Sequence, residues 1–236
     1  NPAAIELVDK NIISGCMNNP GLKHYVSFLN HQPDAMLINE FFGDSEVELV
    51  KKLENVANAL SKKNNVKQVI NITDVKKQEN IWKMRQAGLG LLMNVKGDAK
   101  PYAFVEDTAV APKYLPEFLE KFQNIIDEHG TIAGFYGHAS VGCLHIRPMI
   151  NLKSNNELEK MHSIAQEVAS LVLKYGGSLS GEHGDGILRG VFTEKMFGKT
   201  LTEAFREIKL LFDPKKILNP GKIVDTPGFT NNLKIS

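Results

Sequence analysis

Two short apolar segments, residues 131–138 and 144–152, are separated by a few residues that include Gly142. Such segments are typical of β-strands, and strands joined by so short a connection pair as an antiparallel hairpin. Amphipathic helices are predicted around this hairpin, at 46–60, 76–94, 115–129 and 156–175. Long helices among short strands imply one sheet with helices packed on it. We therefore predict an α+β fold with a largely antiparallel sheet.

The rest of the chain contains shorter patterns. We predict further strands at 34–42, 66–72 and 102–108, and two short helices at 193–197 and 201–212. Residues 5–9 are predicted to end a preceding helix, and SGCMNNPG at 14–21 is typical of a turn-rich linker. The sequence has neither a GxxxxGK[ST] motif nor a strand-GxGxxG-helix unit near its start, so neither nucleotide-binding loop is predicted.

Composition excludes several classes of partner. Lys and Arg number 28 against 27 Asp and Glu, and a net charge of +1 gives no long-range field to attract nucleic acid. No apolar run approaches the roughly 20 residues of a transmembrane helix. Two cysteines cannot build a disulfide framework, which is typical of a reducing compartment. We expect a cytoplasmic location, or a peripheral one at the inner face of the membrane through a larger parent protein.

The segment YGHASVGCLHIR, residues 136–147, places two histidines on either side of the predicted turn. If the turn is centred at 141–142, His138 and His145 lie opposite each other with Cβ atoms about 5 Å apart. Two imidazoles at that separation can bind one divalent metal ion. The alternative is a pair of hydrogen-bonded histidines beside a turn.

The segment SLSGEHGDG, residues 178–186, places Glu182 and His183 among glycines. Small neighbours let adjacent side chains point into the same space, which a regular strand forbids. Glu182 can then complete a set of two histidines and one carboxylate on a metal, while His183 stays available for proton transfer. The alternative is a tight turn with two exposed polar residues.

Three further residues are candidates for binding substrate. Arg85 follows Trp82 by one helical turn, and an arginine beside an aromatic ring suits bidentate contact with a carboxylate, although most helix arginines are solvated. Cys143 and Arg147 share the strand parity of His145, so we expect them on the same face. Arg147 has the alternative of pairing with an acidic neighbour.

The sequences GHASVGCLH, SGEHGDG and LFDPKKILNPGK resemble the C-terminal part of FAD-linked oxidases and dehydrogenases of the vanillyl-alcohol oxidase superfamily. The relatives include D-lactate, glycolate and D-2-hydroxyglutarate dehydrogenases. The resemblance implies a linker from an FAD-binding domain at 1–24, a substrate or cap domain at 25–192 and a C-terminal helical return segment at 193–236. Because the chain starts with Asn1 and not with Met, we expect it to be a piece of a longer protein that lacks the FAD-binding domain here.

The resemblance also implies roles for single residues. A divalent metal, with zinc as the expected ion, has His138, His145 and Glu182 as ligands. His183 is the base near the flavin, and Arg85 binds the substrate carboxylate.

Other positions qualify this picture. Asn219, in LNPGK, is implied to lie near the flavin. Many relatives read GHxGDGNLH, where this chain has Ser140, Val141 and Cys143. The segment VEDTAV at 105–110 lacks a lysine that some 2-hydroxyglutarate enzymes use for a second carboxylate, a role that Arg147 can take instead. This pattern is more similar to long dehydrogenases fused to an iron–sulfur module, so a cluster is expected elsewhere in the parent protein.

The implied reaction is oxidation of a D-2-hydroxy acid to the 2-oxo acid, with hydride transfer to FAD and onward transfer to an electron acceptor. The isolated chain is expected to be inactive, because the flavin performs the redox step. Two arginines favour a dicarboxylate of the 2-hydroxyglutarate type. One alternative is a zinc-dependent hydrolase that uses the same ligands, with His183 activating water. Another is a non-catalytic interaction module with structural histidines.

Overall fold

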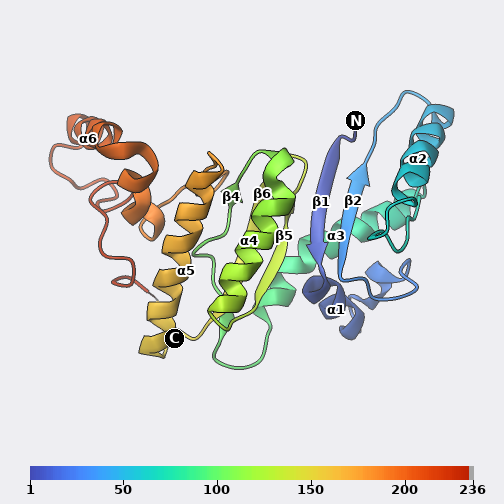
Figure 1. Cartoon of the computed structure of the whole chain (residues 1–236), viewed down its shortest axis with the longest axis horizontal. Coiled ribbons are helices and arrows are strands. Elements are labelled where there is room, and N and C mark those ends of the chain that lie inside the picture. Colours follow the sequence, from blue (N-terminus) through green and yellow to red (C-terminus); the bar gives the residue numbers. More distant parts are fainter. Residues whose placement is uncertain (234–236) are drawn as a thin grey trace. The chain divides into compact units, whose positions relative to one another are not determined.

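The computed structural model describes residues 1–233, and the chain divides into two compact units. Unit 1 comprises residues 1–95 and 134–140, and unit 2 comprises residues 96–133 and those from 141 onward. The elements of unit 1 are β1 (Ala4–Asp9), α1 (Lys10–Asn18), the 3-10 helix η1 (Lys23–Val26), β2 (Ala35–Glu40), α2 (Glu46–Leu60), α3 (Val75–Met93) and β5 (Ala133–His138) (Figure 1). Those of unit 2 are β3 (Lys100–Pro101), β4 (Thr108–Ala109), η2 (Pro112–Tyr114), α4 (Leu115–Glu128), β6 (Cys143–Ile150), α5 (Asn155–Lys174), η3 (Arg189–Phe192) and α6 (Thr193–Phe212).

The strand β1 lies in the middle of a three-stranded antiparallel arrangement in unit 1. It pairs with β2, where Leu7 lies opposite Leu37, and with β5, where Glu6 lies opposite His138. In unit 2, β6 pairs antiparallel with the two short strands β3 and β4. These pairings confirm the predicted α+β fold with a largely antiparallel sheet.

The predictions for residues 5–9 and 14–18 were wrong, because residues 4–18 form β1 and α1, whereas the expected turn is present at residues 19–21. Asp9 ends the strand and begins the helix: its carboxylate accepts hydrogen bonds from the backbone N–H groups of Asn11 and Ile12. The same carboxylate accepts from the backbone N–H of Phe135 in β5 at 2.9 Å. Cys16, in the stretch expected to be a linker, is fully buried. Partners distant in sequence therefore decide the structure of this segment.

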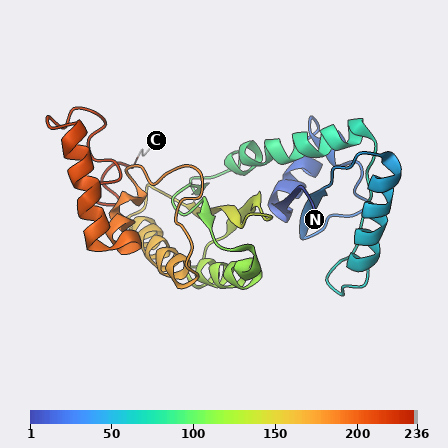
Figure 2. The same cartoon turned by 90° about the horizontal axis from the view of Figure 1, so that it is seen from above.

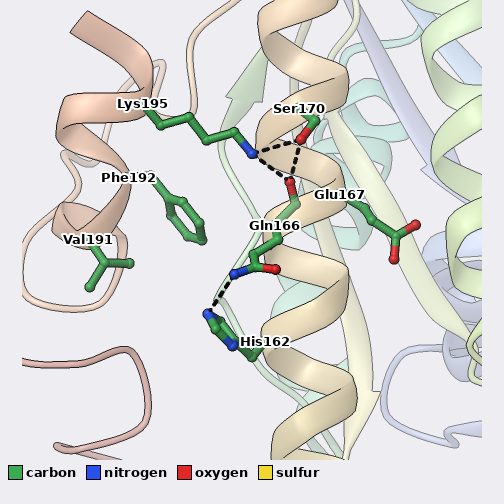
Figure 3. Close-up of a pocket in the computed structure, with 7 residues that line it drawn as sticks. All are labelled: His162, Gln166, Glu167, Ser170, Val191, Phe192 and Lys195. Carbon is green, nitrogen blue, oxygen red and sulfur yellow. Dashed lines mark hydrogen bonds between the residues drawn. The ribbon is translucent and has the colours of Figure 1, made fainter. Parts of the chain in front are cut away.

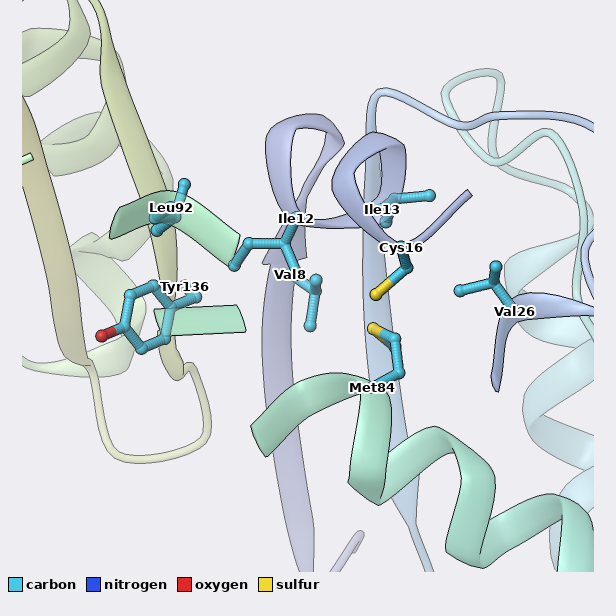
Figure 4. Packing of buried hydrophobic residues seen from close by; sticks show 8 residues of the cluster. All are labelled: Val8, Ile12, Ile13, Cys16, Val26, Met84, Leu92 and Tyr136. Atoms are coloured by element: carbon cyan, nitrogen blue, oxygen red, sulfur yellow. The ribbon is translucent and has the colours of Figure 1, made fainter. Parts of the chain in front are cut away.

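Helices α1 and α3 lie side by side over the buried core of unit 1 (Figure 2). The core residues shown in Figure 4 come from β1, α1, η1, α3 and β5; they are Val8, Ile12, Ile13, Cys16, Val26, Met84, Leu92 and Tyr136. Apolar residues at helical spacing on α1 and α3 thus meet one face of the strands, as expected for an α+β unit.

The strand β6 separates an apolar from a polar face in unit 2. Leu144 and Ile146 are fully buried, while the alternate residues Cys143, His145 and Arg147 contact acidic residues. Helices α4 and α5 lie side by side in both views (Figure 1 and Figure 2), and each contributes fully buried side chains. The turn before β6 needs a glycine, because Gly142 has φ 75° and a Cβ there would lie 1.8 Å from the carbonyl oxygen of Val110.

Most other elements were predicted correctly, and two strands were not. The helix α6 is interrupted at Gly198, whose φ of 77° is not helical, so the prediction of two short helices there is confirmed. Residues 66–72 form no strand, and they are exposed or only partly buried. Residues 102–108 are mostly irregular, because Asp107 adopts φ 69° and breaks the extended backbone. The proposed domain limits at residues 24 and 192 stay predictions.

Within residues 1–233, no helix combines the length with the apolar character that is needed to cross a bilayer. Both cysteines are buried and neither forms a disulfide.

We predict that Met84→Ala lowers the free energy of unfolding of unit 1 by about 2 to 5 kcal/mol, because Met84 is fully buried and its loss leaves a cavity. Met93→Ala is the matched control on the same helix, since Met93 is 41% exposed. Urea unfolding followed by the fluorescence of Trp82, the only tryptophan, reports on α3 directly. Equal losses in the two variants would contradict the assigned core.

Candidate functional site

Two of the predicted site residues, His138 and Arg85, meet in unit 1 through Glu6. The Oε1 atom of Glu6 lies 2.6 Å from Nδ1 of His138, and Oε2 lies 2.8 Å from Nε of Arg85. The Glu6 side chain is 8% exposed, so one buried carboxylate is shared by an arginine and a histidine. The guanidinium of Arg85 also lies 4.9 Å from the centre of the Tyr136 ring, which is a cation–π distance.

The other predicted histidines and Glu182 meet in unit 2. The rings of His145 and His183 are stacked, with centroids 5.2 Å apart and planes inclined by 9°. One oxygen of Glu182 lies 3.9 Å from Nε2 of His145 and 3.8 Å from Nε2 of His183. His145 is buried, whereas the side chains of Glu182 and His183 are about half exposed. The arrangement therefore presents two imidazoles and a carboxylate toward one point at the surface of this unit.

These atoms fit a divalent metal of the zinc type. Zinc binds nitrogen and oxygen ligands at about 2.0 to 2.2 Å, so two ligands of one ion can be at most about 4.4 Å apart. The Nε2 atom of His145 and Oε2 of Glu182 satisfy this limit. Unit 2 therefore brings together two of the three predicted metal ligands. His138 belongs to unit 1, so its convergence with them stays a prediction.

The Glu182–His183 segment is held by the buried carboxylate of Asp107. Asp107 accepts hydrogen bonds from the backbone N–H groups of Glu182 and His183, from the Ser180 hydroxyl at 2.6 Å and from the Cys143 thiol. Burial alone raises the pKa of Asp107, but these hydrogen bonds outweigh it and hold the pKa below its usual value. One oxygen of Asp107 also lies 4.0 Å from Nδ1 of His183. Because its oxygens already accept several hydrogen bonds, Asp107 is better suited to shaping the segment than to binding a metal.

Two buried arginines complete the polar frame of unit 2. Arg189 donates hydrogen bonds to the carbonyl oxygens of Glu106, Leu179 and Gly184, which lie on both sides of the segment. Arg147 pairs with Oε2 of Glu106. The second oxygen of Glu106 lies 3.4 Å from Nδ1 of His183. Glu106 is therefore placed between a permanent cation and the predicted base.

The remaining predicted residues lie as follows. Cys143 is buried, and burial together with its hydrogen bond to Asp107 raises the pKa of its thiol to about 12, so it is a neutral thiol at pH 7. Arg147 takes the alternative of an acidic partner, Glu106. Asn219 lies on an exposed turn with φ 50°, and its side chain accepts a hydrogen bond from Lys222. Their contacts with substrate or flavin stay predictions.

The polar cluster of unit 2 carries an excess of negative charge. Its four carboxylates are those of Glu106, Asp107, Glu182 and Asp185, and its two guanidinium groups are those of Arg147 and Arg189. Burial raises the pKa of Asp185, which reduces the repulsion in part. With neutral histidines, the excess of carboxylates over guanidinium groups favours a bound cation.

One hollow of unit 2 lies away from these residues. Its volume is about 590 Å³, and it is lined by His162, Gln166, Glu167, Ser170, Val191, Phe192 and Lys195 (Figure 3). The ammonium group of Lys195 donates to the Ser170 hydroxyl at 2.7 Å and to the carbonyl of Gln166 at 3.1 Å. The ammonium group of Lys195 is therefore engaged in hydrogen bonds to α5. The hollow contains none of the predicted site residues.

Sequence reasoning missed four residues that organise the site: Glu6, Glu106, Asp107 and Arg189. A signal was present for three of them. Glu6 is a single charge between apolar residues in AIELV, and the adjacent acids Glu106 and Asp107 interrupt an apolar run at 104–110. Buried charges of this kind need a partner or a function. Nothing in the sequence distinguishes Arg189 from a solvated arginine.

Known proteins resemble this chain over almost its whole length. The family model described as FAD linked oxidases, C-terminal domain, matches residues 1–223. A D-2-hydroxyglutarate dehydrogenase of Haemophilus influenzae is 36% identical over 233 residues, covering 94% of this chain and 22% of that protein. A D-lactate dehydrogenase of Archaeoglobus fulgidus is 30% identical over 226 residues, covering 94% of this chain and 46% of that protein. The chain thus spans less than half the length of either relative.

A solved structure has the same fold. The 4-ethylphenol oxidase from Gulosibacter chungangensis, in an isoeugenol complex, matches 95% of this chain and 48% of its own chain with a TM-score of 0.60. The sequence identity is 15%, so this likeness concerns the fold alone. These relatives give no support to the zinc-dependent hydrolase alternative.

We predict that Asp107→Ala lowers the free energy of unfolding by about 3 to 5 kcal/mol at pH 7, because it leaves the N–H groups of Glu182 and His183 without their acceptor and the buried Arg189 without the carboxylate of its ion pair. The contribution of the ionised carboxylate is present above the unfolded pKa of about 3.9 and is lost as the pH falls through the lower folded pKa. Urea titrations from pH 7 to pH 3 test both points. Asp98→Ala, at an exposed ion pair with Lys153, is the control and should have no measurable effect. A loss that was the same at pH 3 as at pH 7 would argue for packing alone.

Proposed function

Because the chain belongs to the family of C-terminal domains of FAD-linked oxidases, we propose that it binds the substrate of an FAD-dependent dehydrogenase or oxidase. The reaction is oxidation of a D-2-hydroxy acid, of the D-lactate, glycolate or D-2-hydroxyglutarate type, to the 2-oxo acid. The single observation that carries the proposal is the cluster in unit 2, where Glu106 faces one nitrogen of His183 and His145 and Glu182 lie within ligand distance of each other.

Arg85 is proposed to bind the carboxylate of the substrate. Its Nε donates to Glu6, and the four N–H bonds on its two terminal nitrogens provide enough donors for a bidentate contact. Contact with Glu6 and with the Tyr136 ring restricts the guanidinium to one orientation, which lowers the entropic cost of binding an anion.

His183 is proposed to remove the proton of the α-hydroxyl group. Its Nδ1 lies 3.4 Å from Glu106, and we propose that Nδ1 carries the proton and that Nε2 is the accepting nitrogen. The carboxylate of Glu106 then stabilises the imidazolium that forms when Nε2 takes the proton. About half of the His183 side chain is exposed, which leaves it accessible to a substrate.

We propose His138, His145 and Glu182 as the ligands of a divalent ion of the zinc type. A metal held by these three side chains would supply polarisation of the substrate hydroxyl, and FAD would supply the acceptor for the hydride of the α-carbon. The excess of carboxylates in unit 2 supports a cation, because two uncompensated negative charges would otherwise repel an anionic substrate.

The FAD-binding domain is proposed to be another part of the same parent protein, as the coverage of 22% and 46% of the two relatives suggests. Apolar side chains stay exposed on α6, among them Leu211 and Phe212 at 77% and 78%, and such surfaces are typical of contact with a partner. Asn219, on the turn after α6, is proposed to lie near the flavin. An iron–sulfur module, an electron acceptor and a cytoplasmic or peripheral membrane location belong to this proposal for the parent protein.

The substrate is proposed to be a small 2-hydroxy acid, with D-2-hydroxyglutarate favoured by the relatives that are named D-2-hydroxyglutarate dehydrogenase. Arg147 remains a candidate for binding a second carboxylate, but its charge is already compensated by Glu106. Cys143 is proposed to lie at the edge of the substrate site. The observations that support this are its hydrogen bond to Asp107 and its position beside Gly181, the residue before Glu182.

The chain purified alone is expected to be colourless. If the FAD-binding domain lies elsewhere in the parent protein, the absorbance of the chain between 350 and 500 nm should stay at background after incubation with FAD, on the order of a few per cent of stoichiometric binding at most. Stoichiometric yellow flavin bound to this chain would show that the proposed division between the two domains is wrong.

Arg85→Ala, in the chain combined with the FAD-binding domain of its parent protein, is expected to lower kcat/KM for every D-2-hydroxy acid about ten- to a hundredfold. A charge-assisted contact to a carboxylate contributes about 1.5 to 3 kcal/mol. A dye acceptor assay with D-lactate and D-2-hydroxyglutarate measures the effect. Arg206→Ala is the control; this arginine on α6 pairs with Glu203 on the same helix and with Asp225 beyond the end of the helix. Oxidation of these acids at the wild-type rate by Arg85→Ala would exclude the assigned role.

A further inference from the structure

We propose that Glu6 is a positioning residue, which holds His138 in the tautomer with the proton on Nδ1 and holds Arg85 in one orientation. The benefit to catalysis rests on the function proposed above. The geometry of the three side chains does not, because it lies entirely within unit 1.

Glu6 is fixed by the sheet and not by a flexible loop. It lies on β1 directly opposite His138 on β5, and directly opposed residues of an antiparallel pair share one face. Val8 and Tyr136 form the next opposed pair along the same two strands, so Tyr136 also points to this face. Arg85 reaches the carboxylate from α3. Three separate elements thus converge on one carboxylate that is 8% exposed.

The chemistry of the carboxylate determines the tautomer. An ionised carboxylate accepts hydrogen bonds and donates none, so the Nδ1 atom of His138, 2.6 Å away, has to carry the proton. The lone pair of the neutral imidazole then lies on Nε2. A histidine that donates from one nitrogen to a carboxylate and binds a metal through the other is a recurrent arrangement of metal sites. The tautomer fixed by Glu6 is therefore the one that a metal ligand on Nε2 requires.

Stability does not explain this buried carboxylate. A buried ion pair is frequently no more stable than apolar side chains of similar volume, because both charges lose their hydration. Glu6 lies between Ile5 and Leu7 and on the same face of β1 as the core residue Val8. An apolar residue at this position would satisfy packing. The pair with Arg85 offsets the charge, and the second oxygen is used to orient His138.

The substitution Glu6→Gln separates these roles, since glutamine has the same shape but one oxygen and one NH2 group. If the NH2 group faces His138, Nδ1 has to accept and the proton moves to Nε2. If the NH2 group faces Arg85, it opposes the Nε–H donor of the guanidinium, and Arg85 loses the contact that orients it. Glu40→Gln is the matched control, because it removes a carboxylate from the neighbouring strand β2 and leaves Glu6 in place.

The tautomer is measured by long-range 1H–15N correlation of the histidine-labelled whole chain at about pH 8, above the ordinary imidazole pKa of about 6.5. We assign the His138 signals by their loss in His138→Asn. The expected result is a proton on Nδ1 in the wild type and in Glu40→Gln. In Glu6→Gln we expect its loss from Nδ1, because Arg85 can only donate and therefore takes the amide oxygen, which leaves the NH2 group facing His138. A wild-type chain with the proton on Nε2 overturns the proposal without any variant, so misfolding of Glu6→Gln cannot hide a failure.

Zinc binding by titration calorimetry provides the second readout. Glu6→Gln is expected to bind Zn²⁺ about ten- to a hundredfold more weakly than the wild type, as is usual when the partner of a ligating histidine is removed. Unchanged affinity together with an unchanged tautomer overturns the positioning role. A wild-type chain that binds no zinc, but whose His138 tautomer depends on Glu6, contradicts the proposed metal and supports the positioning role.

Discussion

The shape of the Glu182–His183 segment depends on the buried carboxylate of Asp107. Residues 180–186 lie outside helices and strands, so their backbone N–H groups need acceptors elsewhere. Asp107 accepts from two consecutive N–H groups, and Arg189 donates to carbonyls before and after them. Held in this way, the adjacent side chains of Glu182 and His183 approach to 3.8 Å, whereas a regular strand would send them to opposite faces.

The same arrangement of charges occurs once in each unit. A glutamate bridges an arginine and a histidine: Arg85, Glu6 and His138 in unit 1, and Arg147, Glu106 and His183 in unit 2. In both cases the arginine neutralises a buried carboxylate, so that the carboxylate can face an imidazole without a large cost in stability. The orientation of each histidine is thereby set by a residue outside the two motifs that make the sequence distinctive.

The sequence predicted well what depends on local periodicity. The helices α2 to α5, the strands β2, β5 and β6 and the break at Gly198 follow from apolar spacing, caps and glycine. It predicted poorly what depends on distant partners, such as β1, whose neighbours lie about 30 and 130 residues away. Within the site, the motif residues were found by their chemistry. Glu6 and Asp107 were missed because their roles exist only once β5 and the segment 180–186 are in place.

The pairing of Arg147 bears on the charge of the substrate. A guanidinium beside a buried glutamate is already neutralised, and binding a substrate carboxylate there would leave Glu106 buried with a second anion near it. The same Glu106 faces His183, so its displacement would also release the proposed base. Arg85 differs, because Glu6 contacts only its Nε and the terminal nitrogens retain their donors. The charge balance therefore favours the proposal that Arg85 binds the α-carboxylate. A second substrate carboxylate would need a cation other than Arg147, as long as Arg147 stays paired with Glu106.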